Sequence, residues 1–232
     1  AQIWEKQRQA LFDVGNEVTR ILNSKAPALP SSQITFSLLE NAAQEYETIF
    51  DSSYGGFGPA PKFPMAHNLL FLMEYAKNNE AAQVMVETTL LRMYQGGLFD
   101  HIGGGFSRYS TDEKWLIPHF EKMLYDNAML LYLYSTAYCQ KNQDFYRYVA
   151  QQTGNYVLRE LRSEQGGFYC GQDADSDGVE GKYYTFTPSE IAAVLGEEKG
   201  QAFCDFFQIT PQGNFEGKSV PSRLNQPFLL PP

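Results

Sequence analysis

Paired helical segments recur along the chain and constrain its fold more than any other feature. Apolar residues return every three, four or seven positions, which is the spacing of one buried helical face. Within the later pairs the two helices are separated only by "NNE", by "KNQD" or by Gly196. The pattern predicts a stack of helical hairpins with segments at 3–22, 35–50, 69–77, 81–94, 119–140 and 145–161 and a shorter pair around Gly196.

One helix start carries its own signal in the sequence. Thr187-Pro188-Ser189-Glu190 combines an N-cap threonine, a proline at the first helical position and a glutamate at the third. These residues together form a capping box, which satisfies backbone N–H groups at a helix N-terminus. A helix is therefore predicted to begin at Pro188.

Three glycine-rich connectors separate the helical pairs. They begin at Tyr54, Gly103 and Gly166, and each contains Gly-Gly-Phe. Connectors that follow completed hairpins emerge on the same rim of a hairpin stack, and long loops in compact domains often carry function. We therefore expect the three connectors to meet at one mouth.

The second connector, "GGGFSRYSTDEKWLIPHFEKMLYDNA", leads into a helix predicted to start near Pro118. His119, Lys122 and Asp126 fall on one stripe of that helix at about 100° per residue. One interpretation is structural: Glu121 favours the first turn of a helix, and Lys122 with Asp126 forms an ordinary i,i+4 pair.

The other interpretation of this junction is chemical. Glu121 and Asp126 lie near His119 in the sequence, and carboxylates beside a histidine can share proton transfer. Arg108 and Trp115 belong to the same connector, and an indole ring can stack on the face of a sugar. Both interpretations remain open at this point.

The third connector contains four acidic residues, Asp173, Asp175, Asp177 and Glu180. Its flanks, "FY" at 168–169 and "YYTF" at 183–186, predict a short β-hairpin with its turn near Asp177-Gly178. A helix-loop-helix calcium site is excluded, because Tyr184 falls where the twelfth-position glutamate would stand. Three roles remain open for these acids: a weaker cation site, a solvated turn, or a carboxylate that reaches the mouth. The turn is favoured for Asp177 and the mouth for Asp175.

Composition excludes several classes of partner. The formal net charge of −9 opposes binding to nucleic acid, and the apolar runs are far shorter than a membrane span requires. Three distant cysteines without a CxxC motif favour a reducing compartment, so we expect a cytoplasmic protein. The sequence contains no zinc motif and no phosphate-binding glycine loop, and no metal or cofactor is expected.

The motifs "YGGFGPAPKFP", "GGGFSRYSTDEKWLIPHFEKMLYDNA", "QDADSDGVEGKYYTF" and "GNFEGK" resemble the thioredoxin-domain-containing family related to spermatogenesis-associated protein 20. In that family a thioredoxin-like domain precedes a helical region similar to the (α/α)6 toroids of glycoside hydrolases and N-acylglucosamine 2-epimerases. The resemblance covers about 35–224, and the absence of CxxC here means that no redox role transfers.

The resemblance implies an all-α fold, a partial (α/α)6 toroid with a small β-hairpin in a loop. Residues 1–34 are expected to form a helix and linker packed on a single toroid domain at 35–232. About four of six hairpins are present, so we expect a fragment or a shortened member that self-associates through uncovered apolar faces.

The fold relatives imply a carbohydrate-active domain that hydrolyses a glycosidic bond or epimerises a sugar, with a sugar as its ligand. Hydrolysis needs two carboxylates about 5 to 10 Å apart, whereas epimerisation needs bases on both faces of the ring. The alternative is a non-catalytic scaffold that binds a peptide or a partner domain. The expected catalytic residues are His119, Glu121, Asp126 and Asp175, and the expected substrate-binding residues are Phe57, Arg108, Tyr109, Trp115 and Asp173.

Overall fold

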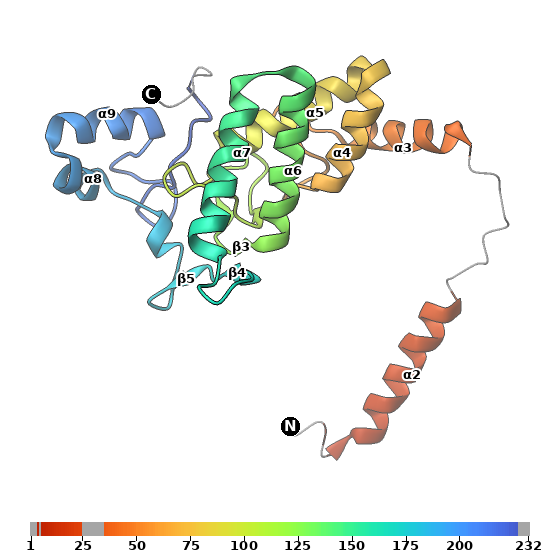
Figure 1. Ribbon diagram of the computed structural model, residues 1–232. Helices are drawn as coiled ribbons and strands as arrows, with labels where there is room; N and C mark the ends of the chain where they lie inside the picture. The colour runs from red at the N-terminus through yellow and green to blue at the C-terminus, as the bar shows by residue number, and fades with distance from the viewer. Residues whose placement is uncertain (1–3, 5, 25–34, 227–232) are drawn as a thin grey trace. The chain divides into compact units, whose positions relative to one another are not determined.

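The computed structural model describes residues 4, 6–24 and 35–226, and the chain divides into two compact units, Ala1–Glu40 and Asn41–Pro232 (Figure 1). The first unit contains helix α2 (Arg8–Ser24), none of whose residues is buried. Helix α3 (Phe36–Ile49) crosses the boundary between the units. Ile3 and most of the predicted linker, 25–34, lie outside the described residues, and the packing of the first helix on the toroid stays a prediction.

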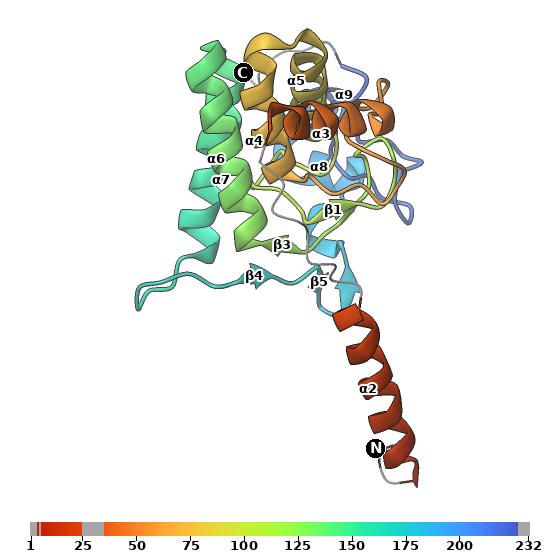
Figure 2. The same ribbon diagram turned by 90° about the vertical axis from the view of Figure 1, so that its right-hand side faces the viewer.

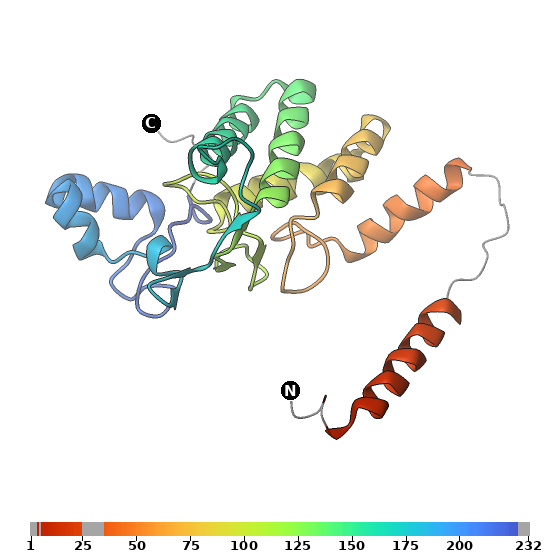
Figure 3. The ribbon, with the colours of Figure 1, turned by 60° about the horizontal axis from the view of Figure 1, so that its bottom comes forward.

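The second unit consists mainly of antiparallel helical pairs, as the periodicity predicted. Helix α4 (Ala66–Tyr75) and the 3₁₀ turn η1 (Ala76–Asn78) pack against α5 (Glu80–Gln95). Helix α6 (Leu124–Lys141) packs along α7 (Asp144–Tyr156), which ends in a π-helical turn η2 (Val157–Leu161), and α8 (Pro188–Leu195) packs against α9 (Glu197–Phe207). Figure 3 shows α8 and α9 in blue on one side of the connecting segments and α6 and α7 in green on another.

The core lies between the first helical pairs and is rich in aromatic side chains. Tyr94, Tyr134 and Phe106 are fully buried there. The Tyr134 hydroxyl donates to the carbonyl oxygen of Leu90 at 2.7 Å, so the polar tip of this buried ring is satisfied. This aromatic core holds α5 and α6 together and fixes the connectors that leave them.

The predicted capping box is confirmed at the start of α8. The Glu190 backbone N–H donates to Thr187 Oγ1 at 3.2 Å, and the Thr187 backbone N–H donates to Glu190 Oε2 at 2.7 Å. Two N–H groups that a helix start leaves unpaired are thereby satisfied reciprocally.

Short strands pair within the connectors and, in one case, between two of them (Figure 2). They pair antiparallel as β1 (Tyr109–Ser110) with β2 (Pro118–His119), β3 (Lys122–Met123) with β4 (Gly171–Gln172), and β5 (Asp175–Ser176) with β6 (Val179–Glu180). A further bridge joins Lys62 to Ser110 through backbone hydrogen bonds of 2.9 and 2.8 Å. The first connector thus contacts the second, and the second contacts the third, which confirms that they meet.

Two local predictions from the sequence are wrong. The helix expected to start near Pro118 begins at Leu124, because 118–119 pair as a strand with 109–110 and 122–123 pair with 171–172. The expected i,i+4 pair of Lys122 with Asp126 is therefore not formed: Lys122 binds Asp100 instead.

The β-hairpin of the third connector is shorter than expected. Its turn at Asp177-Gly178 is confirmed, with both residues at positive φ (53° and 73°) as a two-residue hairpin turn requires. The expected flanks do not pair with each other, because Phe168 bridges Arg162 and Phe186 bridges Ser219.

The first two Gly-Gly-Phe connectors fold into the same turn. In the first copy Asp51 Oδ1 accepts from the backbone N–H groups of Ser53 and Tyr54, and the buried Lys62 Nζ donates to Asp51 Oδ2 at 2.5 Å and to the Gly55 carbonyl at 2.8 Å. A buried lysine and an aspartate thus hold this loop closed.

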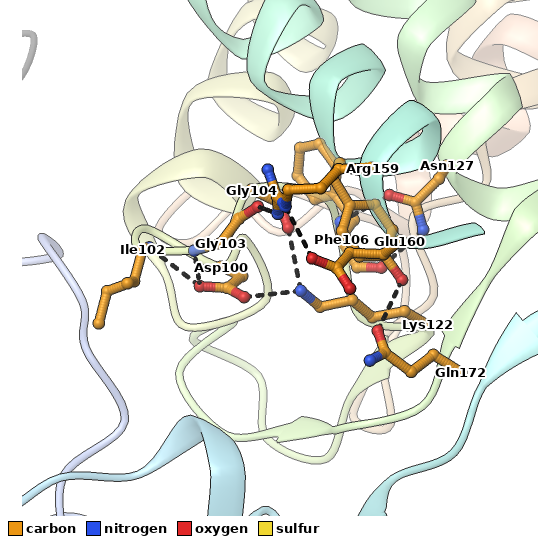
Figure 4. Close-up of polar contacts among 11 residues, drawn as sticks. Asp100, Ile102, Gly103, Gly104, Phe106, Lys122, Asn127, Arg159, Glu160 and Gln172 are labelled. Carbon is orange, nitrogen blue, oxygen red and sulfur yellow. Dashed lines mark hydrogen bonds and ion pairs between the residues drawn. The ribbon is translucent and has the colours of Figure 1, made fainter. Parts of the chain in front are cut away.

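The second copy repeats these contacts (Figure 4). Asp100 Oδ1 accepts from the N–H groups of Ile102 and Gly103, and Lys122 Nζ donates to Asp100 Oδ2 at 2.7 Å and to the Gly104 carbonyl at 2.9 Å. Lys122 is 1% exposed and lies 4.5 Å from the centre of the Tyr156 ring. Burial alone would raise the pKa of Asp100, but Lys122 and the two N–H donors hold it below its ordinary value.

Candidate active site

A group of charged side chains lies where β2 leads into α6 and meets the third connector. We call it the His119 cluster, and its members are Arg108, His119, Glu121, Asp126 and Glu180. Four of the residues expected to act on a sugar therefore lie together: three of the expected catalytic residues and Arg108. They are partly exposed, so solvent and small ligands can reach them.

His119 lies between two carboxylates. Its Nδ1 is 2.7 Å from Glu180 Oε1, and its Nε2 is 3.9 Å from Glu121 Oε2. The ring stacks on Tyr109 at 5.1 Å between centroids, because the β1–β2 register places Tyr109 opposite His119. Strand pairing thus fixes the plane of the imidazole, and the two acids lie near its two nitrogens.

Arg108 supports Glu121 through two contacts. Its Nη1 donates to Glu121 Oε2 at 2.9 Å, and its backbone N–H donates to the Glu121 carbonyl at 2.8 Å. Its Nε is buried and has no hydrogen-bond partner among the described residues. Because Arg108 remains cationic at any physiological pH, it can stabilise negative charge that develops on a bound molecule nearby.

Asp126 lies in the first turn of α6 and is partly buried. Burial raises its pKa to about 6; Arg108 lowers the value and Glu121 raises it. Its Oδ2 is buried and has no partner in the described part of the chain. A carboxyl group with this pKa exchanges protons near neutral pH, as general acids and bases do.

Asp173 and Asp175 are exposed and lie beside the cluster. Asp175 stands opposite Glu180 in the β5–β6 register, and its backbone N–H donates to Asp173 Oδ1 at 3.2 Å. The member of the acidic group that binds His119 is Glu180, which the sequence analysis did not select. The two-residue turn at 177–178 is the signal that could have identified it, because such a turn aligns Asp175 with Glu180.

Two of the expected sugar-stacking residues do not lie in the cluster. The Trp115 side chain is 0% exposed, and its Nε1 donates to the Tyr54 carbonyl at 2.9 Å, so neither face of the indole is open to a ligand. Phe57 packs at the edge of the core against Tyr46 and Phe50. Both aromatic rings support the first connector. Stacking on a sugar is therefore not proposed for either.

The described residues contain no group of three or more His, Cys, Asp or Glu side chains arranged to hold a metal ion. Cys139, Cys170 and Cys204 are free thiols. Within the described ranges, no helix has both the length and the apolar character needed to cross a bilayer.

Comparison with solved structures identifies the fold. The chain aligns with cellobiose 2-epimerase from Spirochaeta thermophila with a TM-score of 0.50 and 19% identity, over 59% of this chain and 39% of the epimerase. It aligns with a sugar epimerase from a ruminal bacterium with the same TM-score and 15% identity, over 73% of this chain and 53% of that enzyme. The mostly helical fold with few short strands is thus a partial (α/α) toroid.

Sequence comparison identifies the relatives. No family model matches the chain. Human spermatogenesis-associated protein 20 is 36% identical in an alignment that covers 94% of this chain and 31% of the human protein. The rat protein of the same name is 38% identical in an alignment that covers 86% of this chain and 27% of its own length. The chain is therefore a homologue of spermatogenesis-associated protein 20 and spans about a third of the length of those relatives.

Proposed function

We propose that this chain carries acid/base chemistry on a sugar, and that the reaction is a proton transfer next to the carbonyl group of a reducing sugar, as in epimerisation. The observation that carries the proposal is His119, held between Glu121 and Glu180. Asp126, whose pKa is raised to about 6, interacts with Glu121 and Arg108 of the same cluster. The names of the two solved toroids, both sugar epimerases, favour epimerisation over hydrolysis.

The proposed roles follow from the contacts of the cluster. A base removes the proton from carbon 2 of the open-chain sugar, the electron pair moves onto the carbonyl oxygen, and a proton returns to the opposite face of carbon 2. His119 and Asp126 are the proposed proton carriers, because imidazole is a common general acid and base and burial raises the pKa of Asp126 to about 6. Arg108 is proposed to stabilise the developing oxyanion, while Glu121 and Glu180 orient His119.

The test is deuterium exchange at carbon 2. Glucose, mannose and cellobiose are incubated with the protein in D₂O, and loss of the carbon-2 proton signal is followed by proton NMR. We expect exchange with at least one sugar and a loss of at least about 100-fold in Asp126→Asn and in His119→Gln. Glu113→Gln, a change of the same size at an exposed residue of the second connector, is the matched control and keeps full exchange.

Two results would count against the proposal. Folded protein that exchanges no proton with any of the three sugars removes its basis and favours the scaffold alternative. Exchange that survives in both cluster variants assigns the chemistry to other residues. Circular dichroism of each variant separates a loss of chemistry from a loss of fold.

A further inference from the structure

A cavity away from the His119 cluster has a positive lining in a negatively charged chain. It has a volume of about 540 Å³ and lies between the end of α5, the loop from β1 to β2, and the segment that follows α9. Arg92 and Lys114 line it, and none of the described residues in its wall is acidic. In a chain with a net charge of −9, a cavity lined by two cations and no acid is complementary to an anion.

Neither cation forms an ion pair with a described residue. Lys114 forms no ion pair with any described residue, and its Nζ lies 5.7 Å from the centre of the Tyr54 ring. Arg92 makes one long hydrogen bond, from Nη1 to Gln95 Oε1 at 3.3 Å, which leaves most of its five N–H donors available. The last turn of α5 favours a cation at position 92, but that effect does not explain Lys114.

Two acids precede Lys114 in the sequence: Glu113 is exposed and forms no ion pair with it among the described residues, and Asp112 is engaged elsewhere. Asp112 accepts hydrogen bonds from the backbone N–H groups of Lys114, Leu116 and Ile117 at 2.7, 3.2 and 2.6 Å. It therefore shapes the loop that carries Lys114 and does not pair with the ammonium group. Among the described residues, no carboxylate pairs with the two cations of the cavity, while the loop that carries Lys114 is held in place.

The remaining polar wall suits the hydroxyl groups of a ligand. Gln208, Thr210, Ser222 and Asn225 supply amides and hydroxyls to the cavity. Ser222 Oγ is 3.0 Å from Gln208 Oε1, so the amide oxygen is occupied and the two N–H donors of Gln208 remain for another group. Donors and acceptors of this kind fix the orientation of polyhydroxylated ligands.

Tyr54 forms the aromatic side of the cavity, and the first connector holds it in place. Trp115 Nε1 donates to the Tyr54 carbonyl, and the Tyr54 backbone N–H donates to Asp51 Oδ1 at 3.0 Å. Asp51 is in turn bound by the buried Lys62. The Tyr54 ring thus projects from a closed turn, which makes this side of the cavity preformed.

We propose that this cavity binds a phosphorylated sugar, with Arg92 and Lys114 on the phosphate and the amides and hydroxyls on the sugar. Arginine matches the geometry of a phosphate with two parallel N–H donors, and lysine adds a compact charge. The inference does not depend on proton transfer at the His119 cluster, with which the cavity shares no residue.

Calorimetric titration with inorganic phosphate, glucose 6-phosphate and glucose tests this site by binding alone. We expect glucose 6-phosphate to bind more tightly than phosphate, and glucose to bind at least about 10-fold more weakly than its phosphate ester. The double variant Arg92→Gln/Lys114→Gln is expected to weaken the sugar phosphate at least 10-fold. Lys77→Gln, an exposed lysine of η1, controls for the loss of one positive charge and should bind normally.

The proposal is overturned if no phosphate compound binds at millimolar concentration, or if the double variant binds as the parent does. Equal affinity for phosphate and glucose 6-phosphate would refute a sugar phosphate as the ligand. Lys114→Gln alone changes an exposed side chain and keeps the fold, so a loss of binding in that variant supports the site even if the double variant unfolds. Carbon-2 exchange measured on the same proteins tests the His119 cluster separately.

Discussion

Lys62 and Lys122 occupy equivalent positions in two copies of one turn. Each donates to an aspartate carboxylate and to the carbonyl oxygen of a glycine four residues after that aspartate. Both side chains are 1% exposed, so each ammonium group depends on its aspartate for compensation of its charge. The two copies form the base of the connectors, and the second copy adjoins Glu121, a member of the proposed active site.

Replacing Lys122 by methionine is expected to destabilise the protein by about 3–5 kcal/mol, because Asp100 is left buried and unpaired. Adding Asp100→Asn should recover part of that loss, since asparagine still accepts from Ile102 and Gly103 without a charge. Urea unfolding of the parent, both single variants and the double variant measures the coupling. Additive effects in the double variant would show that the two side chains do not act as a pair.

Gly105 is expected to tolerate alanine far less well than Gly58. Both residues have positive φ, 78° and 74°, which costs an alanine about 1 kcal/mol at either position. A Cβ at Gly105 would also clash with the Tyr156 ring, whereas a Cβ at Gly58 meets nothing within 4 Å. Thermal unfolding should show about 1 kcal/mol lost in Gly58→Ala and about 3 kcal/mol or more in Gly105→Ala. Equal losses would mean that the packing around Gly105 relaxes freely.

Asp126→Asn is expected to stabilise the protein at high pH and to have little effect at low pH. The pKa of this carboxyl group is raised to about 6 in the folded protein, so its ionisation opposes folding. This loss of stability is absent below the unfolded-state pKa, near 4, and is complete at pH values above 6. Allowing for partial exposure, the variant should gain about 1 kcal/mol at pH 8. Unfolding free energies at pH 4 and pH 8 measure this difference, and an effect that is the same at both values would contradict the raised pKa.

The capping box predicts a loss of about 1 kcal/mol in Thr187→Ala, because the Glu190 backbone N–H loses its acceptor. Thr136→Ala is a suitable control in α6, where the hydroxyl bonds to the Tyr132 carbonyl within an exposed helix face. That change should alter the unfolding free energy by less than about 0.5 kcal/mol. Denaturant titration of both variants compares a threonine at a helix start with one inside a helix.

Local patterns were sufficient to predict the helical pairs and the start of α8. They failed at 118–123, where 118–119 pair with the nearby strand 109–110 and 122–123 pair with 171–172, about fifty residues later. They also failed for Lys122, because a lysine is rarely buried and its partner Asp100 lies 22 residues earlier. Tertiary contacts determine both outcomes, and an apolar repeat every three or four residues carries no information about such contacts.

The same limit applies to the candidate site. Glu121 and Asp126 were identified because they follow His119 closely, whereas Glu180 lies 61 residues beyond it. Trp115 was chosen for its ring, but burial depends on neighbours from another connector, here Tyr54. Residue type and spacing identified part of the site, and the fold decided which side chains reach it.

The third turn, at 162–168, has Ser163 in the place of the aspartate, and most of its residues are exposed. Its backbone still closes through bonds between Ser163 and the two glycines, at 3.1 Å each. Opening this turn uncovers almost no apolar surface and separates no buried charges, so it should fluctuate independently of the other two. In a hydrogen-exchange experiment its amide protons would be replaced by deuterium first, and those beside Asp51 and Asp100 would be replaced much later.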